Sequence, residues 1–168
     1  LMEFAKGLRS SAPTPLDDFL YDNDNKKVLE FLDFTLRGKT GDRASNWAEK
    51  HMDFSAEKGV QLSQSLPPAE SRMSQWHPVL QARERQIIGL RAALDPRTTS
   101  VDCSQDVARK KSSSMTDKIN TCTPGQRVWL LNTPTPRHRL MLGEESFRLR
   151  GYPIDKMNME TVGDKMMA

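Results

Sequence analysis

Hydrophobic residues in the first half of the chain recur at the spacing of helices. The segment 26–37 carries an apolar stripe and predicts a helix. A second helix is expected to run through NWAEKHMDFSAEKG and to stop at Gly59. A third is expected to begin near Ser71, to strengthen through LQARERQIIGLRAAL and to end at residues 95–96. Its arginines lie away from the apolar stripe and are expected to form a solvated face rather than to contact phosphates: Arg83, Arg85 and Arg91.

Short β-branched and alternating runs in the second half predict strands. One strand is expected over Thr99–Cys103. Two more, Ile119–Thr123 and Arg127–Leu131, are joined by Pro124-Gly125, which favours a tight turn because Pro fixes φ and Gly accepts positive φ. We therefore expect a β-hairpin there, and a loop over the basic, serine-rich stretch DVARKKSSSMTDK that precedes it. The whole pattern predicts an α+β fold, in which helical segments are followed by a small β-hairpin unit and a short helix.

The segment 137–153, RHRLMLGEESFRLRGYP, predicts a strand, a short helix and a turn. The helix is expected to begin at Gly143, where the acidic residues of its first turn oppose the positive end of the helix dipole. With Leu142 as the N-cap, the Glu145 carboxylate can accept a hydrogen bond from the free amide of that residue.

The end of this helix is marked as clearly as its start. Arg148 follows Glu144 by four residues and Glu145 by three, so an intrahelical ion pair worth roughly a few tenths of a kcal/mol is expected. Gly151 stands at the position after the helix that favours positive φ, and Pro153 prevents its continuation.

Charge is distributed unevenly along the chain. The segment 83–150 carries thirteen Lys and Arg against seven Asp and Glu, whereas the formal net charge of the whole chain is +3. The densest basic cluster is Arg109, Lys110 and Lys111, where a phosphate backbone would be attracted with an affinity that falls as salt rises. Hydrophobic residues make up 36% of the 168 residues, so we expect a modest core, or a piece of a larger protein with both ends cut.

Cysteine and histidine positions predict neither a metal centre nor a nucleophile. Cys103 and Cys122 are too few for a disulfide framework, and neither has a base and a proton donor placed beside it in the sequence. His51 has no second His or Cys at metal-ligand spacing and is expected to be packed against other side chains. The sequence has no signal peptide and no apolar run long enough to span a membrane, so we expect no membrane association and an intracellular protein, nuclear if eukaryotic.

The spacing within 139–153 resembles the ninth motif of DNA (cytosine-5) methyltransferases. The family pattern is Arg-x-Leu-Thr-Pro-x-Glu-x-x-Arg-Leu-x-Gly-Phe-Pro, and this chain reads Arg-x-Met-x-x-x-Glu-x-x-Arg-Leu-x-Gly-Tyr-Pro. The matching positions are Arg139, Met141, Glu145, Arg148, Leu149, Gly151, Tyr152 and Pro153. Leu142 and Gly143 replace the family's Thr-Pro, which is an N-cap and first-turn pair, so the helix start is expected to be weak.

The resemblance implies a target-recognition region that contacts double-stranded DNA, because this region precedes the ninth motif in the family. Contacts with base edges are implied for Thr121, Thr123 and Arg127, and contacts with the backbone for Lys110 and Lys111. Arg137, in the basic approach to the motif, is a further candidate for DNA binding. The scaffold joining this region to the catalytic part would consist of Arg139, Glu145, Arg148, Gly151 and Pro153.

The resemblance also implies that the chain is the C-terminal portion of a larger enzyme. The complete enzyme has a Rossmann-like α/β fold and transfers a methyl group from S-adenosylmethionine to cytosine C5. These residues contain no Gly-rich cofactor loop, Pro-Cys nucleophile, Glu-Asn-Val or Gln-x-Arg-x-Arg segment, so we expect a catalytic domain elsewhere in the same polypeptide and no cofactor bound by motifs here. The expected divisions are a mainly helical segment (1–94), the recognition region (95–136) and the motif with a C-terminal helix (137–168).

Two other classes of protein remain open on the sequence. One is a non-catalytic helical module that binds other proteins and carries a basic loop. The other is a free-standing basic protein that binds DNA or RNA, although an aromatic platform interleaved with the basic residues is absent from the sequence.

Overall fold

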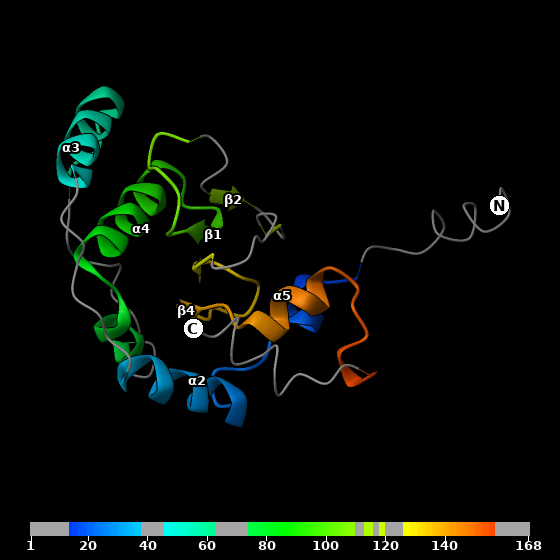
Figure 1. The fold of residues 1–168 in the computed structure, drawn as a ribbon. Helices are drawn as coiled ribbons and strands as arrows, with labels where there is room; N and C mark the ends of the chain where they lie inside the picture. The colour runs from blue at the N-terminus through cyan, green and yellow to red at the C-terminus, as the bar shows by residue number, and fades with distance from the viewer. Residues whose placement is uncertain are drawn as a thin grey trace, which may run out of the picture.

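The computed structural model describes residues 14–37, 46–62, 74–109, 113–115, 118–119 and 126–156 (Figure 1). These residues form an α+β arrangement in which helices surround a four-stranded antiparallel sheet. The helical elements are η1 (Leu16–Phe19), α2 (Lys26–Arg37), α3 (Trp47–Lys58), η2 (Ser74–Val79), α4 (Ala82–Leu94), α5 (Gly143–Leu149) and η3 (Ile154–Lys156). The strands are β1 (Thr98–Asp102), β2 (Ser113–Met115), β3 (Val128–Leu130) and β4 (Arg139–Leu140).

The first two helices form as their apolar spacing predicts. Helix α2 has the predicted bounds and buries one face through Val28, Phe31 and Leu32. Helix α3 ends at Gly59, whose φ of +63° lies in the left-handed region that favours glycine. A helix of this length with one apolar face must pack that face against other elements, because a short helix is only marginally stable alone in water.

The predicted third helix is divided in two, and the expectation of one continuous helix is wrong. Pro78 lies inside the 3-10 element η2 and disfavours the α conformation of the residue before it. The chain is then extended at Gln81, with φ −73° and ψ 161°, before α4 begins. Glu84 caps the N-terminus of α4, because its carboxylate accepts a hydrogen bond from the backbone amide of Gln81 at 2.9 Å.

The sheet has the order β2-β1-β3-β4, and all its neighbouring strands are antiparallel. The predicted strands at 99–103 and 127–131 correspond to β1 and β3. The loop expected over the serine-rich stretch is wrong at Ser113–Met115, which pairs with β1 as an edge strand. An edge strand this short can form through backbone hydrogen bonds alone, so its sequence need not show a hydrophobic pattern.

The predicted hairpin between 119–123 and 127–131 is not how β3 is paired. One edge of β3 pairs with β1 and the other with β4, for example Trp129 with Val101 and with Leu140. No edge of β3 is left for the expected partner. Ile119 lies outside the strands, and residues 120–123 and the Pro124-Gly125 turn lie outside the part of the chain that the structure describes.

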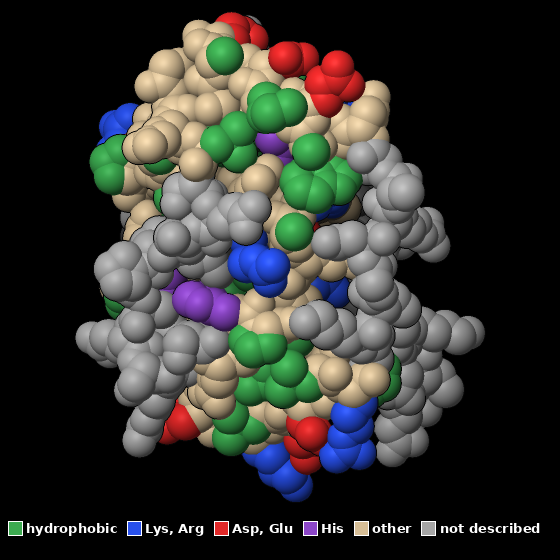
Figure 2. Space-filling view, turned by 90° about the vertical axis from the view of Figure 1, so that its left-hand side faces the viewer, with side chains coloured by type: hydrophobic (Ala, Val, Ile, Leu, Met, Phe, Trp, Pro, Cys, Tyr) green, Lys and Arg blue, Asp and Glu red, His purple; other side chains and the backbone are tan. Residues whose placement is uncertain are grey.

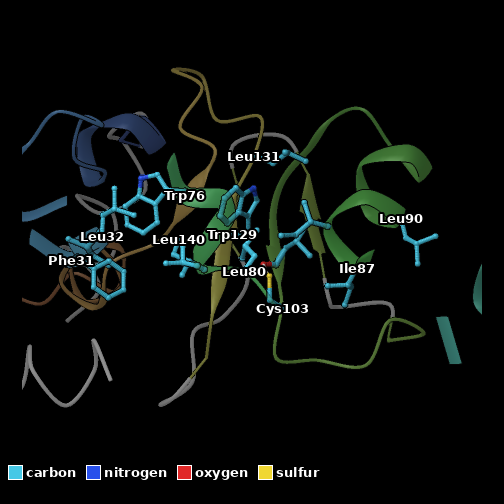
Figure 3. Packing of buried hydrophobic residues seen from close by; sticks show 14 of the residues in the cluster. Phe31, Leu32, Trp76, Leu80, Ile87, Leu90, Cys103, Trp129, Leu131 and Leu140 are labelled. Carbon is cyan, nitrogen blue, oxygen red and sulfur yellow. Dashed lines mark hydrogen bonds between the residues drawn. The ribbon is translucent and has the colours of Figure 1, made fainter. Parts of the chain in front are cut away.

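One cluster of buried apolar side chains joins α2, α3, η2, α4, β1, β3 and β4. Trp129 lies in the middle of the cluster in Figure 3, between the side chains of α2 and η2 and those of α4. The labelled neighbours on the first side are Phe31, Leu32 and Trp76, and those on the second are Ile87 and Leu90. The helical and strand-forming segments therefore share a core.

The arginines of α4 do not form the solvated face that the sequence suggests. Arg83 donates to the carbonyl oxygens of Cys103 and Gln105, and Arg91 donates to those of Val107 and Arg109. These bonds satisfy carbonyl groups of the loop that follows β1. They thereby fix that loop against α4.

Candidate functional site

The residues of the ninth-motif pattern meet in a buried polar network, which is the candidate functional site. Strand β4 supplies Arg139 and helix α5 supplies Glu145, and both side chains are 0% exposed. The two form a bidentate ion pair, with Nη1 2.8 Å from Oε2 and Nη2 2.6 Å from Oε1. The same carboxylate accepts the Leu142 amide at 2.8 Å, as the sequence predicts. A buried charge of this kind is stable only when its partners satisfy it, and here several donors converge on one carboxylate.

Tyr21 is the centre of the other half of the network, and sequence reasoning missed it. Its backbone amide donates to Glu145 Oε1 at 2.7 Å, and its carbonyl oxygen accepts from Arg137 at 2.9 Å and from Arg139 at 2.7 Å. Its hydroxyl donates to Glu144 at 2.7 Å. Tyr21 lies in the acidic segment LDDFLYDND, and no local pattern predicts that the backbone of this segment meets residues more than a hundred positions later.

Side chains from two other elements cover the Tyr21 ring and hydroxyl. The Arg148 guanidinium lies 5.0 Å from the ring centroid, and the Lys27 ammonium lies 5.4 Å from it. Burial first, and then the Glu144 carboxylate, raise the pKa of Tyr21. The hydrogen bond to Glu144, which outweighs burial, raises the pKa of Lys27. Both groups therefore keep their protons at neutral pH and hold Glu144 between them.

Arg137, a predicted DNA contact, is turned into the protein. Its side chain is 2% exposed and donates to Asp17 at 2.5 Å and to the Thr135 carbonyl oxygen at 2.9 Å. Burial alone would raise the pKa of Asp17, but hydrogen bonds from Thr135 and Arg137, together with the arginine charge, lower it below its ordinary value. Arg137 thus belongs with the motif scaffold in this arrangement, which does not favour the predicted contact with DNA.

The predicted end of α5 is confirmed in detail. Gly151 has φ +77° and its amide donates to the Arg148 carbonyl oxygen at 2.9 Å, while the Tyr152 amide donates to that of Phe147 at 3.1 Å. This is a Schellman motif, and the Phe147 and Tyr152 rings make its usual hydrophobic contact at 5.4 Å. Arg148 uses its Nη2 to reach the Asp18 carbonyl oxygen at 2.9 Å rather than the acidic residues of its own helix.

Arg127, another predicted DNA contact, repeats the Arg139–Glu145 arrangement at a second helix start. Its Nε lies 2.6 Å from Glu84 Oε1, and its Nη2 donates to the Val79 carbonyl oxygen at 3.2 Å. In both places, an arginine at the start of a strand or directly before it pairs with the glutamate whose carboxylate accepts from the N-cap amide of a helix. Arg127 is 40% exposed, so one edge of it still reaches solvent while it fixes η2, α4 and β3 together.

The other four predicted DNA contacts lie outside the described residues: Lys110, Lys111, Thr121 and Thr123. Pro153, of the predicted scaffold, follows the Schellman turn and precedes η3. On the side of the molecule that Figure 2 shows, Lys and Arg side chains lie in several separate places, and those at the bottom of the view lie next to acidic side chains. A continuous basic surface is therefore not visible on the described part of that face.

Cys103, which lies outside the network, is poorly placed for covalent chemistry. Cys103 is fully buried, and burial, with Glu84 as the next cause, raises the pKa of its thiol well above the ordinary value. A protonated, buried thiol is inert as a nucleophile. His51 is packed as predicted, 2% exposed, with Nδ1 3.1 Å from Gln86 Oε1. Among the described residues, no group of three or more His, Cys, Asp and Glu is placed to hold a metal ion.

No family model, curated protein or solved structure matches the chain. Within the ranges that the structure describes, none of the helices has the length and hydrophobicity needed to cross a bilayer.

Proposed function

We propose that this chain is the DNA-recognition portion of a DNA (cytosine-5) methyltransferase. The observation that carries the proposal is the Arg139–Glu145 ion pair, in which two positions of the motif pattern meet with 0% exposure. Gly151 supports the proposal, because its place in the motif predicts a positive φ just after the helix, and its φ is +77°. A pattern that matched by chance would not be expected to place its polar residues at the centre of a single tertiary network.

In this proposal, the network is the joint between the recognition region and a Rossmann-like catalytic domain in the same polypeptide. That domain would bind S-adenosylmethionine and carry the nucleophile for methyl transfer to cytosine C5. The complete protein would be intracellular, and nuclear in a eukaryote. The cheapest test is the neighbouring coding sequence, where a Pro-Cys, Glu-Asn-Val and Gln-x-Arg-x-Arg series upstream is expected. An open reading frame that extends upstream without them would contradict the proposal.

Duplex DNA is the proposed partner, and Lys110 and Lys111 are the proposed backbone contacts. The affinity of the full polypeptide for duplex DNA should fall with salt, and Lys110→Ala/Lys111→Ala should reduce the slope of log K against log[salt] by about 2. The matched control is Lys26→Ala/Lys58→Ala, which removes the same charge from α2 and α3 and should leave the slope unchanged. Equal slopes in all three proteins would remove these lysines from the interface.

A second candidate is a module that binds another protein through α2. This helix exposes Leu29 by 43% and Leu36 by 41%, and these residues are seven positions apart on one face. Phe34 is 51% exposed on the same helix. If the full polypeptide shows no detectable binding to duplex DNA at low salt, this function is favoured over the first.

A further inference from the structure

A hollow of about 310 Å³ opens between the start of α3, the start of α4 and the loop after β1. We call it the α3 pocket and define it by Asn46, Trp47, Lys50, His51, Arg83 and Asp106. It lies apart from the network around Glu145, with which it shares no residue. Its volume is at the lower end of the range for small-ligand sites, roughly 300–1,000 Å³, which suits one small molecule rather than a peptide.

The charged lining of the α3 pocket favours an anionic group. Lys50 lies 3.1 Å from Asp106, and a lysine ammonium bonded once in this way has two further protons to donate. Arg83 donates to carbonyl oxygens, which carry no formal charge, and within the described residues it forms no ion pair. Two positive groups against one negative group leave the pocket with a charge of about +1 when His51 is neutral.

The remaining lining offers a ring surface and a hydrogen-bond acceptor. Trp47 is half-buried and meets His51 edge-on, with ring centroids 5.3 Å apart. Gln86 Oε1 can only accept, so the neutral His51 ring carries its proton on Nδ1 and Nε2 is an acceptor. His51 is 2% exposed, so a ligand would meet only the small part of it that lines the pocket. Burial lowers the pKa of His51, which maintains this neutral form. An aromatic face and an acceptor suit a flat heterocycle that carries an amine.

We propose that the α3 pocket binds a single unstacked nucleotide, with its base against Trp47, an exocyclic amine toward His51 and its phosphate beside Lys50 and Arg83. Such a nucleotide can be free or can belong to a single strand of DNA. The proposal stands on the lining of the pocket and does not require the methyltransferase assignment.

Tryptophan fluorescence is a direct measurement of binding here. Trp76 and Trp129 are each 1% exposed, so quenching by a ligand would come from Trp47. Deoxyadenosine monophosphate is expected to quench the fluorescence of the full chain and to bind more tightly than deoxyadenosine, which lacks the phosphate. Thymidine monophosphate, which has no exocyclic amine, is expected to bind more weakly. An absence of quenching by both nucleotides and by single-stranded oligodeoxyadenylate would overturn the proposal.

Substitutions test the contact with the phosphate independently of the contact with the base. Lys50→Ala is expected to weaken binding of deoxyadenosine monophosphate about tenfold, because it removes one charge-assisted hydrogen bond, and to leave deoxyadenosine binding unchanged. Lys58→Ala, on the same helix but outside the pocket, is the control and should bind as the wild type does. Equal nucleotide affinity in Lys50→Ala and the wild type, with unchanged thermal melting, would overturn the phosphate assignment.

The two possible sources of the nucleotide give different results. Quenching by the mononucleotide indicates a free ligand, and quenching by the oligonucleotide alone indicates a nucleotide of a strand, and either supports the pocket. The Lys110→Ala/Lys111→Ala test of duplex binding is independent. Retained quenching with no duplex binding would contradict the proposed function and leave the α3 pocket intact.

Discussion

Individual arginines in this protein are used to satisfy buried carboxylates and carbonyl groups. The Glu145 carboxylate accepts hydrogen bonds from both terminal nitrogens of Arg139 and from two backbone amides, so its charge is compensated although its side chain is 0% exposed. A buried pair of this kind adds little stability relative to an apolar pair of the same size, but removing one member leaves an uncompensated charge. The energetic weight of the site therefore falls on single residues.

Glu145→Gln is expected to lower the free energy of unfolding by about 3–5 kcal/mol, because the Arg139 charge would then be buried without a counter-charge. Urea denaturation measures the change. Glu144→Gln is the matched control. The Glu144 carboxylate pairs with the half-exposed Lys27, so this substitution should lower the free energy of unfolding by about 1 kcal/mol or less. Equal losses in the two variants would show that burial does not set the cost.

At the scale of elements, short helices here depend on their ends. Helix α5 spans Gly143–Leu149, which is too short to be stable alone. Leu142 provides no side-chain cap, and the helix starts instead with the Glu145 carboxylate on the Leu142 amide and stops with the Schellman turn at Gly151. The sequence predicts each of these features because caps depend on residues that are adjacent in the chain.

Gly151→Ala should lower the free energy of unfolding by about 1 kcal/mol, because a Cβ is strained at φ +77°. Within the part of the chain that the structure describes, no atom beyond the glycine and its two chain neighbours lies within 4 Å of the position of that Cβ, so the cost would come from the backbone. Gly143→Ala is the control at the first position of the helix, outside the left-handed region, and should not lower stability. Thermal melting followed by circular dichroism measures both, and stabilisation by Gly151→Ala would contradict the left-handed conformation.

At the scale of the whole molecule, α3 buries one histidine, His51, and η2 holds a half-buried one, His77. Burial lowers the pKa of His51 and of His77 below the ordinary 6.5, with the nearby Arg85 charge as the second cause for His77. The folded protein therefore binds fewer protons than the unfolded chain in the range just below that value. By linkage, stability is complete above about pH 6.5 and is lost as the pH falls through the lower, folded-state pKa values.

The free energy of unfolding should accordingly decrease between pH 7 and pH 5. His51→Asn, which keeps a donor near the position of Nδ1, should remove part of this decrease, and His51→Asn/His77→Asn should remove more. Urea titrations at a series of pH values measure the slope. A wild-type slope of zero, or a slope that survives the double variant unchanged, would contradict the assignment to these histidines.

Much of the local structure could be predicted from the sequence. The bounds of α2, the stop of α3 at Gly59, the strands β1 and β3 and the ends of α5 all follow from apolar spacing and from turn or capping residues. Errors occurred where a proline or an unpatterned edge decided the outcome, at Pro78 and at Ser113–Met115. The expected partner of β3 and the expected solvated face of the α4 arginines were also wrong, because strand pairing and loop contacts depend on distant segments. None of these errors changes the α+β class.

The partners of the polar residues were decided only by the tertiary structure. The sequence pointed to Arg139, Glu145 and Arg148, but it paired Glu145 with Arg148 on one helix, where the structure pairs it with Arg139 and with the Tyr21 backbone. It also directed Arg127 and Arg137 toward DNA, where the structure gives them Glu84 and Asp17. Spacing along a chain fixes which residues share a turn or a face, because those contacts are local. Which charge meets which carboxylate depends on how separate elements pack: Arg127 and Glu84 are 43 residues apart, and Arg137 and Asp17 are 120 residues apart, so folding alone brings them together.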